Sequence, residues 1–226
     1  MDDKKRAGIL RPAQMRHLLR VTEATSRHPE RDNLVLLLGL TCAMRVTEIA
    51  QILPSDVMLP SGQLRKEVSL RAAITKGCRQ RCVFITHPLT VAALNRYIEY
   101  RWKRGMVVDF DRNRFKGLMP EVPLILTHKA SKFELTAKRR ILADGHEETY
   151  LACDSLQAHI SRLYRAAGLH ECSSHSGRRT FATRLVEQGH DLEVVQRLLG
   201  HAELDHADPY LEPSKATLEA MFTTAL

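Results

Sequence analysis

The 226-residue sequence has no long hydrophobic run and no apolar segment at its N-terminus. A membrane-spanning helix needs roughly 20 consecutive apolar residues. The longest apolar-rich run, LVLLLGLTCAM at residues 34–44, is much shorter and fits a buried helix. The opening residues MDDKKRAGIL lack the apolar region of a secretion signal. These absences argue against a membrane-spanning protein and nothing suggests export, so we expect a cytoplasmic protein.

Cysteines are few, and the aromatic residues make up only 5% of the chain. The five cysteines are odd in number, scattered and without a CxxC pair, so we expect reduced thiols rather than a disulfide framework. The run HECSSH (residues 170–175) and the run LLGHAELDHADPY (residues 198–210) hold several possible metal ligands. Neither has a standard zinc spacing. A Gly-rich phosphate loop and a serine-nucleophile elbow are also lacking. The sequence therefore predicts no metal site.

Acidic residues are the scarcer charge, with 26 Asp and Glu against 34 Lys and Arg and a net charge of +8. Neutralising phosphates releases counterions, so a basic balance favours a nucleic-acid partner. Charge alone equally fits an ordinary basic protein. We find no lipidation motif and no long basic amphipathic helix, which argues against an anionic membrane surface.

Apolar periodicity predicts an α+β domain that is mainly α, with a small antiparallel sheet. Helices are expected from Pro12, over 33–53 (a buried helix and then a short one) and over 89–104. Residues 64–86 alternate in polarity and predict two strands joined at Lys76–Gly77. Residues 105–123 are predicted to be a loop and 124–126 a short strand. Residues 129–150, with a possible turn at Asp144–Gly145, are predicted to be an inserted hairpin or loop.

The last third predicts four helices, each with a candidate capping residue. The candidate caps are Asp154, then Ser174 or Ser176, then Asp191, then Ser214. The side chains expected to point inward in the second and third of these helices are Phe181, Leu185, Val186, Leu192, Val195, Leu198 and Leu199. In the fourth they are Leu218, Met221 and Phe222.

The stretch SSHSGRRTFATRL places His175 and Arg178 three residues apart at a predicted helix start. Side chains at this spacing share a face, and a helix start also offers anion-attracting amides. Guanidinium groups match the geometry of a phosphodiester and stabilise the extra charge of its transition state. An exposed basic helix start explains the same pattern, so this motif alone is a weak signal.

A second arginine, Arg45, follows the buried run in TCAMRVTEIAQI, with Glu48 three residues later. Burying an arginine directly after an apolar helix costs free energy unless its charge is paired or binds a ligand. Either Glu48 pairs with it locally, or both belong to a site. Lys76 at the predicted turn is either simply solvated or placed to protonate a leaving oxygen.

Taken together, AMRVTEIAQI, ITKG, HSGRRTFATRL, LLGH and a tyrosine nine residues after that last histidine resemble the phage-integrase (tyrosine recombinase) family. The family order is arginine, lysine, His-x-x-Arg, histidine and tyrosine. All of these are present in that order between Arg45 and Tyr210.

The resemblance implies the fold of the helical tyrosine-recombinase catalytic domain and a reaction on duplex DNA. Tyr210 would attack the scissile phosphate, forming a 3′-phosphotyrosyl link and freeing a 5′-hydroxyl. Arg45, Arg178 and His201 would hold the phosphate oxygens. His175 would assist as a proton acceptor or as a hydrogen-bond donor to the phosphate. Lys76 would protonate the leaving oxygen, and Glu48 would orient Arg45. Because the covalent link stores the bond energy, the resemblance implies no nucleotide cofactor and no metal.

The resemblance has departures. Pro209 directly precedes Tyr210 and disfavours helix for the residue before it, so we expect the tyrosine at a break or in a first turn. Arg45 comes early, so we expect residues 1–226 to be a catalytic domain without the family's N-terminal DNA clamp. DNA binding would then be weak and salt-sensitive. The basic residues of 129–150 expected to compensate on DNA are Lys129, Lys132, Lys138, Arg139 and Arg140, and a solvated charged loop explains them equally well. Arg179, where the family commonly has a histidine, is also expected to bind DNA.

The partners implied are double-stranded DNA, further copies of the chain in a tetramer on DNA, and a possible accessory DNA-binding protein. The C-terminal helix either docks on a neighbouring copy or packs on its own core. The leading interpretation is a site-specific recombinase of a mobile element, bacterial or phage-derived and acting at the nucleoid, for integration or excision. The alternatives are a type IB topoisomerase-like relaxase and a DNA-binding accessory or regulatory protein with the same fold.

Overall fold

The computed structural model describes residues 7–75, 80–109, 111–141, 145–200 and 215–224. The helices are α1 (Pro12–Thr25), α2 (Pro29–Thr41), α3 (Val46–Gln51), α4 (Pro54–Val57), α5 (Pro88–Lys103), α6 (Asp154–Ala166), α7 (Ser176–Glu187), α8 (Leu192–Leu198) and α9 (Lys215–Thr223). The strands are β1 (Glu67–Leu70), β2 (Arg81–Phe84), β3 (Thr136–Ile141) and β4 (Glu147–Ala152). Single 3₁₀ turns cover Ala72–Ile74 and Phe115–Gly117.

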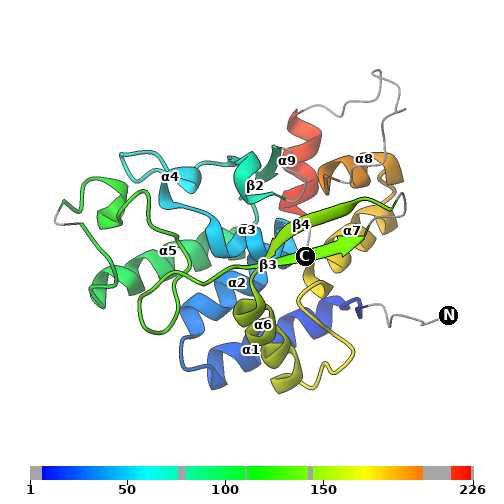
Figure 1. Cartoon of the computed structure of the whole chain (residues 1–226), viewed down its shortest axis with the longest axis horizontal. Helices are drawn as coiled ribbons and strands as arrows, with labels where there is room; N and C mark the ends of the chain where they lie inside the picture. The colour runs from blue at the N-terminus through cyan, green and yellow to red at the C-terminus, as the bar shows by residue number, and fades with distance from the viewer. Residues whose placement is uncertain (1–6, 76–79, 110, 142–144, 201–214, 225–226) are drawn as a thin grey trace.

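Helix α2 lies at the centre of the domain and is buried on nearly every side. Its residues from Leu34 to Leu38 expose 3% of their surface or less. A helix that is apolar all round belongs in a core, and α2 packs against α1, α5 and α7, which lie around it in Figure 1. The predicted buried helix and short second helix in 33–53 are therefore confirmed as α2 and α3.

Several helices begin on a proline. Pro12, Pro29, Pro54 and Pro88 are the first residues of α1, α2, α4 and α5. The first backbone position of a helix needs no N–H partner, and the proline ring already sets a helical φ. The helix predicted from Pro12 is confirmed, and α5 matches the helix predicted over 89–104 to within one residue at each end.

Strands β1 and β2 pair antiparallel, with Glu67 opposite Phe84 and Leu70 opposite Arg81. This pairing confirms the small sheet predicted within residues 64–86. The first strand was predicted too long, because Ala72–Ile74 forms a 3₁₀ turn closed by a hydrogen bond from the Thr75 N–H to the Ala72 carbonyl at 3.1 Å. The turn predicted at Lys76–Gly77 lies outside the described residues.

The strand predicted at 124–126 is wrong. Leu124 and Leu126 are buried, but their N–H groups donate to the Ile52 carbonyl at 2.7 Å and to the Tyr97 hydroxyl at 3.1 Å. Buried Arg101 donates to the Leu124 carbonyl at 2.9 Å. Since buried backbone groups need partners rather than a particular element, these bonds satisfy the segment without a sheet.

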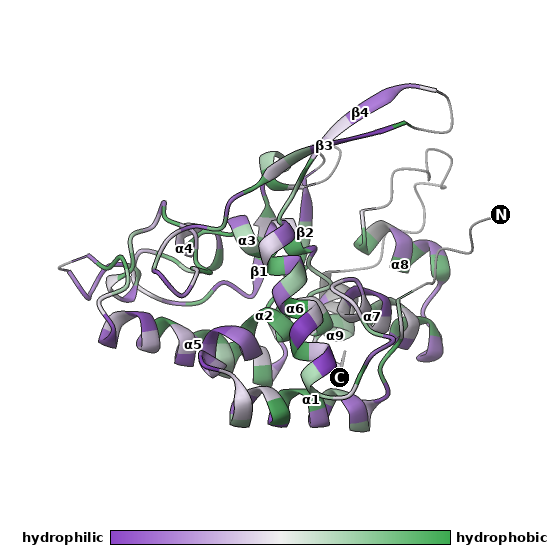
Figure 2. Ribbon diagram, turned by 60° about the horizontal axis from the view of Figure 1, so that its bottom comes forward, coloured by the Kyte–Doolittle hydropathy of each residue, from purple (hydrophilic) through white to green (hydrophobic). Residues whose placement is uncertain are grey.

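Strands β3 and β4 form a second antiparallel pair, from Thr136 opposite Ala152 to Ile141 opposite Glu147. Figure 2 shows this hairpin projecting from the helical body. Of the two possibilities predicted for 129–150, the hairpin is confirmed, although its strands start later and run to residue 152. The described residues of the region predicted as loop, 105–123, hold only the short 3₁₀ turn and one isolated bridge, between Val108 and Leu118.

The helix starts in the last third differ by a residue from several predicted caps. Cys153, not Asp154, precedes α6, and His175, not Ser174 or Ser176, precedes α7. The cap predicted at Asp191 is confirmed, since its side-chain oxygen accepts the Glu193 N–H at 2.7 Å. The cap predicted at Ser214 lies outside the described residues.

Two side chains predicted to point inward do not. Val186 is 43% exposed and Leu192 is 57% exposed. The buried stripe of α7 runs through Phe181 and Leu185, and Val186 lies about a quarter of a turn beyond that stripe. Leu192 begins α8, ahead of buried Val195.

Helix α9 packs on the chain's own core. The ring of Phe222 lies 5.0 Å from that of Phe181 and 5.4 Å from that of Phe84, and Met221 is also buried. Met221 and Phe222 therefore pack on the chain's own core, which is one of the two alternatives predicted for the C-terminal helix. None of the helices in the described part of the chain combines the length and apolar character needed to cross a bilayer.

Candidate active site

Arg45 and Glu48 lie at the start of α3, directly after the central helix. The Arg45 N–H donates to the Glu48 carboxylate at 2.7 Å, which is one half of a capping box. The Arg45 guanidinium donates to the other oxygen of the same carboxylate at 3.0 Å. Glu48 is fully buried, whereas the Arg45 side chain keeps 19% of its surface exposed. The pairing of these two residues is therefore real, and it leaves Arg45 accessible to a ligand.

Arg81, the first residue of β2, is a member of the site that the sequence analysis missed. It donates to both oxygens of Glu48, from Nε at 3.2 Å and from Nη2 at 2.5 Å. The same Nη2 donates to the Ala43 carbonyl at 3.2 Å. The signal that would have found it is the strand period of two, because Arg81 shares its face of β2 with buried Val83.

Arg178, in the first turn of α7, reaches the same place from a third element. Its Nη1 donates to the Ala43 carbonyl at 2.7 Å, and its Nη2 donates to the Leu199 carbonyl. Burial, followed by the positive charges of Arg45 and Arg81, lowers the pKa of the Arg178 guanidinium. Its charge is thus stabilised incompletely by the protein alone.

The electrostatics of the cluster favour an anionic ligand. Burial raises the pKa of Glu48, but Arg81 and Arg45 outweigh burial and hold that pKa below its ordinary value. The carboxylate is ionised at neutral pH, yet it supplies one negative charge to three guanidinium groups. Buried cations without a matching anion are costly, so the arrangement favours an incoming phosphate.

The end of α8 is held against the three arginines through its backbone. The Leu198 carbonyl accepts from Arg81 at 3.3 Å, and the Leu199 carbonyl accepts from Arg45 at 3.3 Å as well as from Arg178. The last four carbonyls of a helix have no partner within it and carry its negative dipole end. Guanidinium groups therefore suit the end of α8, because they donate hydrogen bonds to its carbonyls and carry the opposite charge to its dipole end.

A cleft of about 770 Å³ brings several of the predicted site residues together. Its lining includes Arg45, Arg178 and His175, the residue that precedes α7. The hairpin forms another wall, from which Lys138 and Arg140 face the cleft. Three of the six residues predicted to be catalytic therefore share one cavity.

Lys76, His201 and Tyr210 lie outside the described residues, as does Pro209. Thr75, the described residue next to Lys76, lines the cleft. The Gly200 carbonyl accepts from the Arg45 guanidinium at 3.5 Å. Thr75, directly before Lys76, therefore lies at the cleft, and Gly200, directly before His201, contacts Arg45.

The residues predicted to bind DNA divide into separate groups. Lys138 pairs with Asp154 at 2.6 Å, and Arg140 pairs with Glu148 and lies 5.8 Å above the Tyr150 ring. Arg139, on the opposite face of β3, pairs with Glu147 at 3.5 Å. Much of the hairpin charge is thus already compensated within the hairpin and its neighbouring helix.

The other predicted DNA contacts lie elsewhere. Arg179 donates to the Ala7 carbonyl and so ties the N-terminal segment to α7. Lys129 and Lys132 line a different pocket on the far side of α6. Within the described ranges, no three His, Cys, Asp or Glu side chains are grouped so that they could hold a metal ion.

Comparison with known proteins identifies the chain's relatives. The model of the phage integrase family matches residues 9–217. Tyrosine recombinase XerC of Pelobacter propionicus is 27% identical over 195 residues, covering 86% of this chain and 52% of its own length. Tyrosine recombinase XerD of Staphylococcus epidermidis is 25% identical over 222 residues, covering 98% of this chain and 63% of its own. The chain thus spans between half and two thirds of these relatives' length.

Solved structures share the architecture. XerA recombinase superposes with a TM-score of 0.60 at 20% identity, covering 95% of this chain and 64% of its own. The λ integrase catalytic core gives 0.54 at 15% identity, covering 90% of this chain and 96% of its own. With the family model matching nearly the whole sequence, the chain belongs to the phage integrase family and has the fold of a tyrosine recombinase catalytic domain.

Proposed function

We propose that the chain is the catalytic domain of a tyrosine site-specific recombinase, which cuts and rejoins duplex DNA. The observation that carries the proposal is the group of Arg45, Arg81 and Arg178 around the single carboxylate of Glu48, beside a cleft that also contains His175. Such a site stabilises charge that develops on phosphate oxygens.

In the proposed reaction, the Tyr210 hydroxyl oxygen forms a bond to the scissile phosphorus as the bond from phosphorus to the 5′ oxygen breaks. The product is a 3′-phosphotyrosyl link and a free 5′-hydroxyl. Arg45, Arg178 and His201 hold the phosphate oxygens. Lys76 gives its proton to the 5′ oxygen, and His175 accepts the proton of the Tyr210 hydroxyl or donates a hydrogen bond to the phosphate. A tyrosine of ordinary pKa, about 10, needs such nearby cations to become a nucleophile.

The reverse attack by a 5′-hydroxyl restores the DNA backbone. Because the phosphotyrosyl link keeps the energy of the broken bond, the proposed reaction uses neither a nucleotide cofactor nor a metal ion. Arg81 and Glu48 act through Arg45 and are positioning residues in this scheme.

The proposed partners are duplex DNA, other copies of the chain in a tetramer, and an accessory DNA-binding protein. Proteins of similar fold include XerH recombinase bound to difH substrate and a λ integrase dimer bound to a COC′ core site. For the biological role we propose integration or excision of a mobile element. The Tn1549 transposon integrase, whose structure was solved with circular intermediate DNA, has a similar fold.

The test uses nicked suicide duplexes carrying candidate sites, with a covalent protein–DNA adduct measured on a denaturing gel. Wild-type protein should form the adduct and Tyr210→Phe should not. Tyr150→Phe is the matched control, because Tyr150 lines the cleft and is the rival nucleophile there. An adduct that survives Tyr210→Phe but is lost in Tyr150→Phe would contradict the assignment. Recombinant joints, rather than relaxed circles, would separate a recombinase from a topoisomerase-like enzyme.

A further inference from the structure

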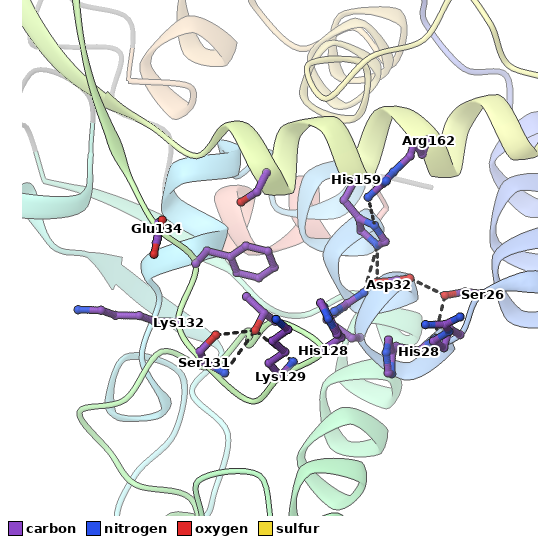
Figure 3. Close-up of a pocket in the computed structure, with 15 residues that line it drawn as sticks. Ser26, His28, Asp32, His128, Lys129, Ser131, Lys132, Glu134, His159 and Arg162 are labelled. Carbon is purple, nitrogen blue, oxygen red and sulfur yellow. Dashed lines mark hydrogen bonds and ion pairs between the residues drawn. The ribbon is translucent and has the colours of Figure 1, made fainter.

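A second pocket, of about 540 Å³, lies on the opposite side of α6 from the active-site cleft. Cys153 and Gln157 face the cleft, whereas Ser155, His159 and Arg162 line the second pocket. At 100° per residue these two sets lie about half a turn apart on the helix. The remaining walls are the start of α2 and the loop 127–134, which leads into β3 (Figure 3).

A buried carboxylate holds the base of this pocket. Asp32 is 1% exposed and accepts hydrogen bonds from Ser26 at 2.5 Å and from His159 at 2.9 Å (Figure 3). It also accepts one from Arg31 at 2.7 Å. Burial raises the pKa of Asp32, but His159 and Arg31 outweigh burial and lower it to about 2. Asp32 therefore fixes two walls of the pocket, and its charge is already satisfied.

The pocket carries more positive than negative charge. Five arginine or lysine side chains line it, against two carboxylates. Arg27, Lys129 and Lys132 make no ion pair within the described part of the chain. The second carboxylate, Glu134, lies away from Asp32 in Figure 3. The lining thus presents several cations that the protein itself does not neutralise.

A histidine and the start of a helix are two further features of this pocket that suit an anion. The His28 ring donates or accepts at Nδ1 with the Tyr100 hydroxyl at 3.0 Å, but its buried Nε2 has no hydrogen-bond partner among the described residues. A buried polar atom without a partner is costly. His28 precedes α2 and its side chain makes no capping hydrogen bond, although Glu30 and Asp32 stand in the first turn of that helix. The N-terminus of a helix attracts an anion.

We propose that this pocket binds a phosphate group, with Lys129 and Arg162 contributing from facing walls. A phosphate matches several convergent cations and takes hydrogen bonds from a guanidinium fork. Its source is either the backbone of a duplex seated over the nearby cleft or a free phosphate-bearing molecule. The duplex source rests on the proposed function, whereas binding of the phosphate group itself does not.

The test compares two double variants of the full chain that each remove two positive charges. Lys129→Gln with Arg162→Gln changes the pocket. Lys103→Gln with Arg165→Gln is the matched control, because both of those side chains are exposed and lie outside the pocket. Equal loss of net charge cancels general electrostatic effects, and the midpoint of urea unfolding checks that both variants fold.

Two measurements follow. The first is an NMR titration of the histidine side chains with inorganic phosphate. Burial and then Arg31 lower the pKa of His28, and bound phosphate should raise that pKa in wild type and in the control but not in the pocket variant. The second is DNA affinity by fluorescence anisotropy against salt concentration. Loss of one phosphate contact should reduce the slope of log K against log salt by about 1.

Loss of the His28 response together with a reduced salt slope supports a backbone phosphate of the duplex. Loss of the His28 response with an unchanged salt slope supports a free phosphate-bearing molecule. If phosphate leaves His28 unchanged in wild type and the two double variants bind DNA alike, the proposal is overturned. Failure of the proposed function looks different, since wild type would then form no covalent adduct while the His28 response to phosphate persisted.

Discussion

Replacing Arg81 with methionine tests whether the three-arginine cluster is held by Glu48. Methionine keeps most of the volume of the buried side chain but removes its charge and its donors. Arg81 supplies two of the hydrogen bonds to Glu48 and also bonds the carbonyls of Ala43 and Leu198. After Arg81→Met, the fully buried carboxylate would retain only its bonds from Arg45.

Removing one partner of a buried ion pair costs about 3–5 kcal/mol, because the remaining charge stays desolvated. We expect the lower end, about 3 kcal/mol, since Arg45 still faces Glu48. The matched control is Arg71→Met. Arg71 pairs with Asp56 at 3.1 Å, but its side chain is 41% exposed, and such pairs contribute about 0–1 kcal/mol.

Urea unfolding at about pH 8 and about pH 5 is the assay, and the sign of the pH effect is part of the prediction. In wild type the pKa of Glu48 is lowered, so its contribution is present above the ordinary glutamate pKa and is lost as pH falls. In Arg81→Met, burial is opposed by fewer cations and the pKa of Glu48 rises. The folded state then takes up a proton at higher pH, so the destabilisation should be larger at pH 8 than at pH 5. A loss equal to that of Arg71→Met at both pH values would refute the reasoning.

Further predictions concern the helix contact, the second pocket and the chemistry. Gly177→Ala should lower the free energy of unfolding by about 1–3 kcal/mol, because the new Cβ would lie 3.0 Å from the Gly39 carbonyl carbon. Gly39→Ala is the control and should not lower it, because its Cβ would meet nothing within 4 Å. Urea unfolding measures both variants. Asp32→Asn should lower the free energy of unfolding by about 2 kcal/mol at neutral pH. In urea titrations, the unfolding free energies of the variant and the wild type should converge as pH falls from 3.8 toward about 2. Arg45→Lys should slow adduct formation by about 10²–10³-fold, with a much smaller loss of DNA affinity by anisotropy. Adduct formation should also be unchanged by excess EDTA, and inhibition would favour a metal-dependent mechanism.

Much of the fold could be predicted because its signals are local. The continuous apolar run of α2, the prolines that begin four helices, and the alternation of β1 and β2 each depend on a few neighbouring residues. The errors arose where a distant group decided the outcome. Residues 124–126 look like a strand, but Tyr97, Arg101 and Ile52 satisfy their backbone instead.

The candidate site was predicted unevenly for a related reason. Arg45, His175 and Arg178 stand in motifs of recognisable spacing, and the structure places all three at one cleft. Arg81 stands in no such motif and joins the cluster through the fold of β2 against α3. The second pocket was also not predictable, since it needs side chains from α2, the loop 127–134 and α6 to meet.

The two arginines that reach Ala43 connect stability with ligand binding. Ala43 has a φ of 50°, a left-handed conformation that is uncommon for residues other than glycine. Its carbonyl accepts from both Arg81 and Arg178, and of these two arginines Arg178 also lines the cleft proposed to bind phosphate. Because burial and neighbouring arginines lower the pKa of Arg178, a phosphate bound as proposed would provide the negative charge that its guanidinium lacks. A ligand that binds only the folded state stabilises it by RT ln(1 + L/Kd), where L is the free ligand concentration. Phosphate bound in the cleft, as in the proposed function, would therefore stabilise the folded loop that joins α2 to α3.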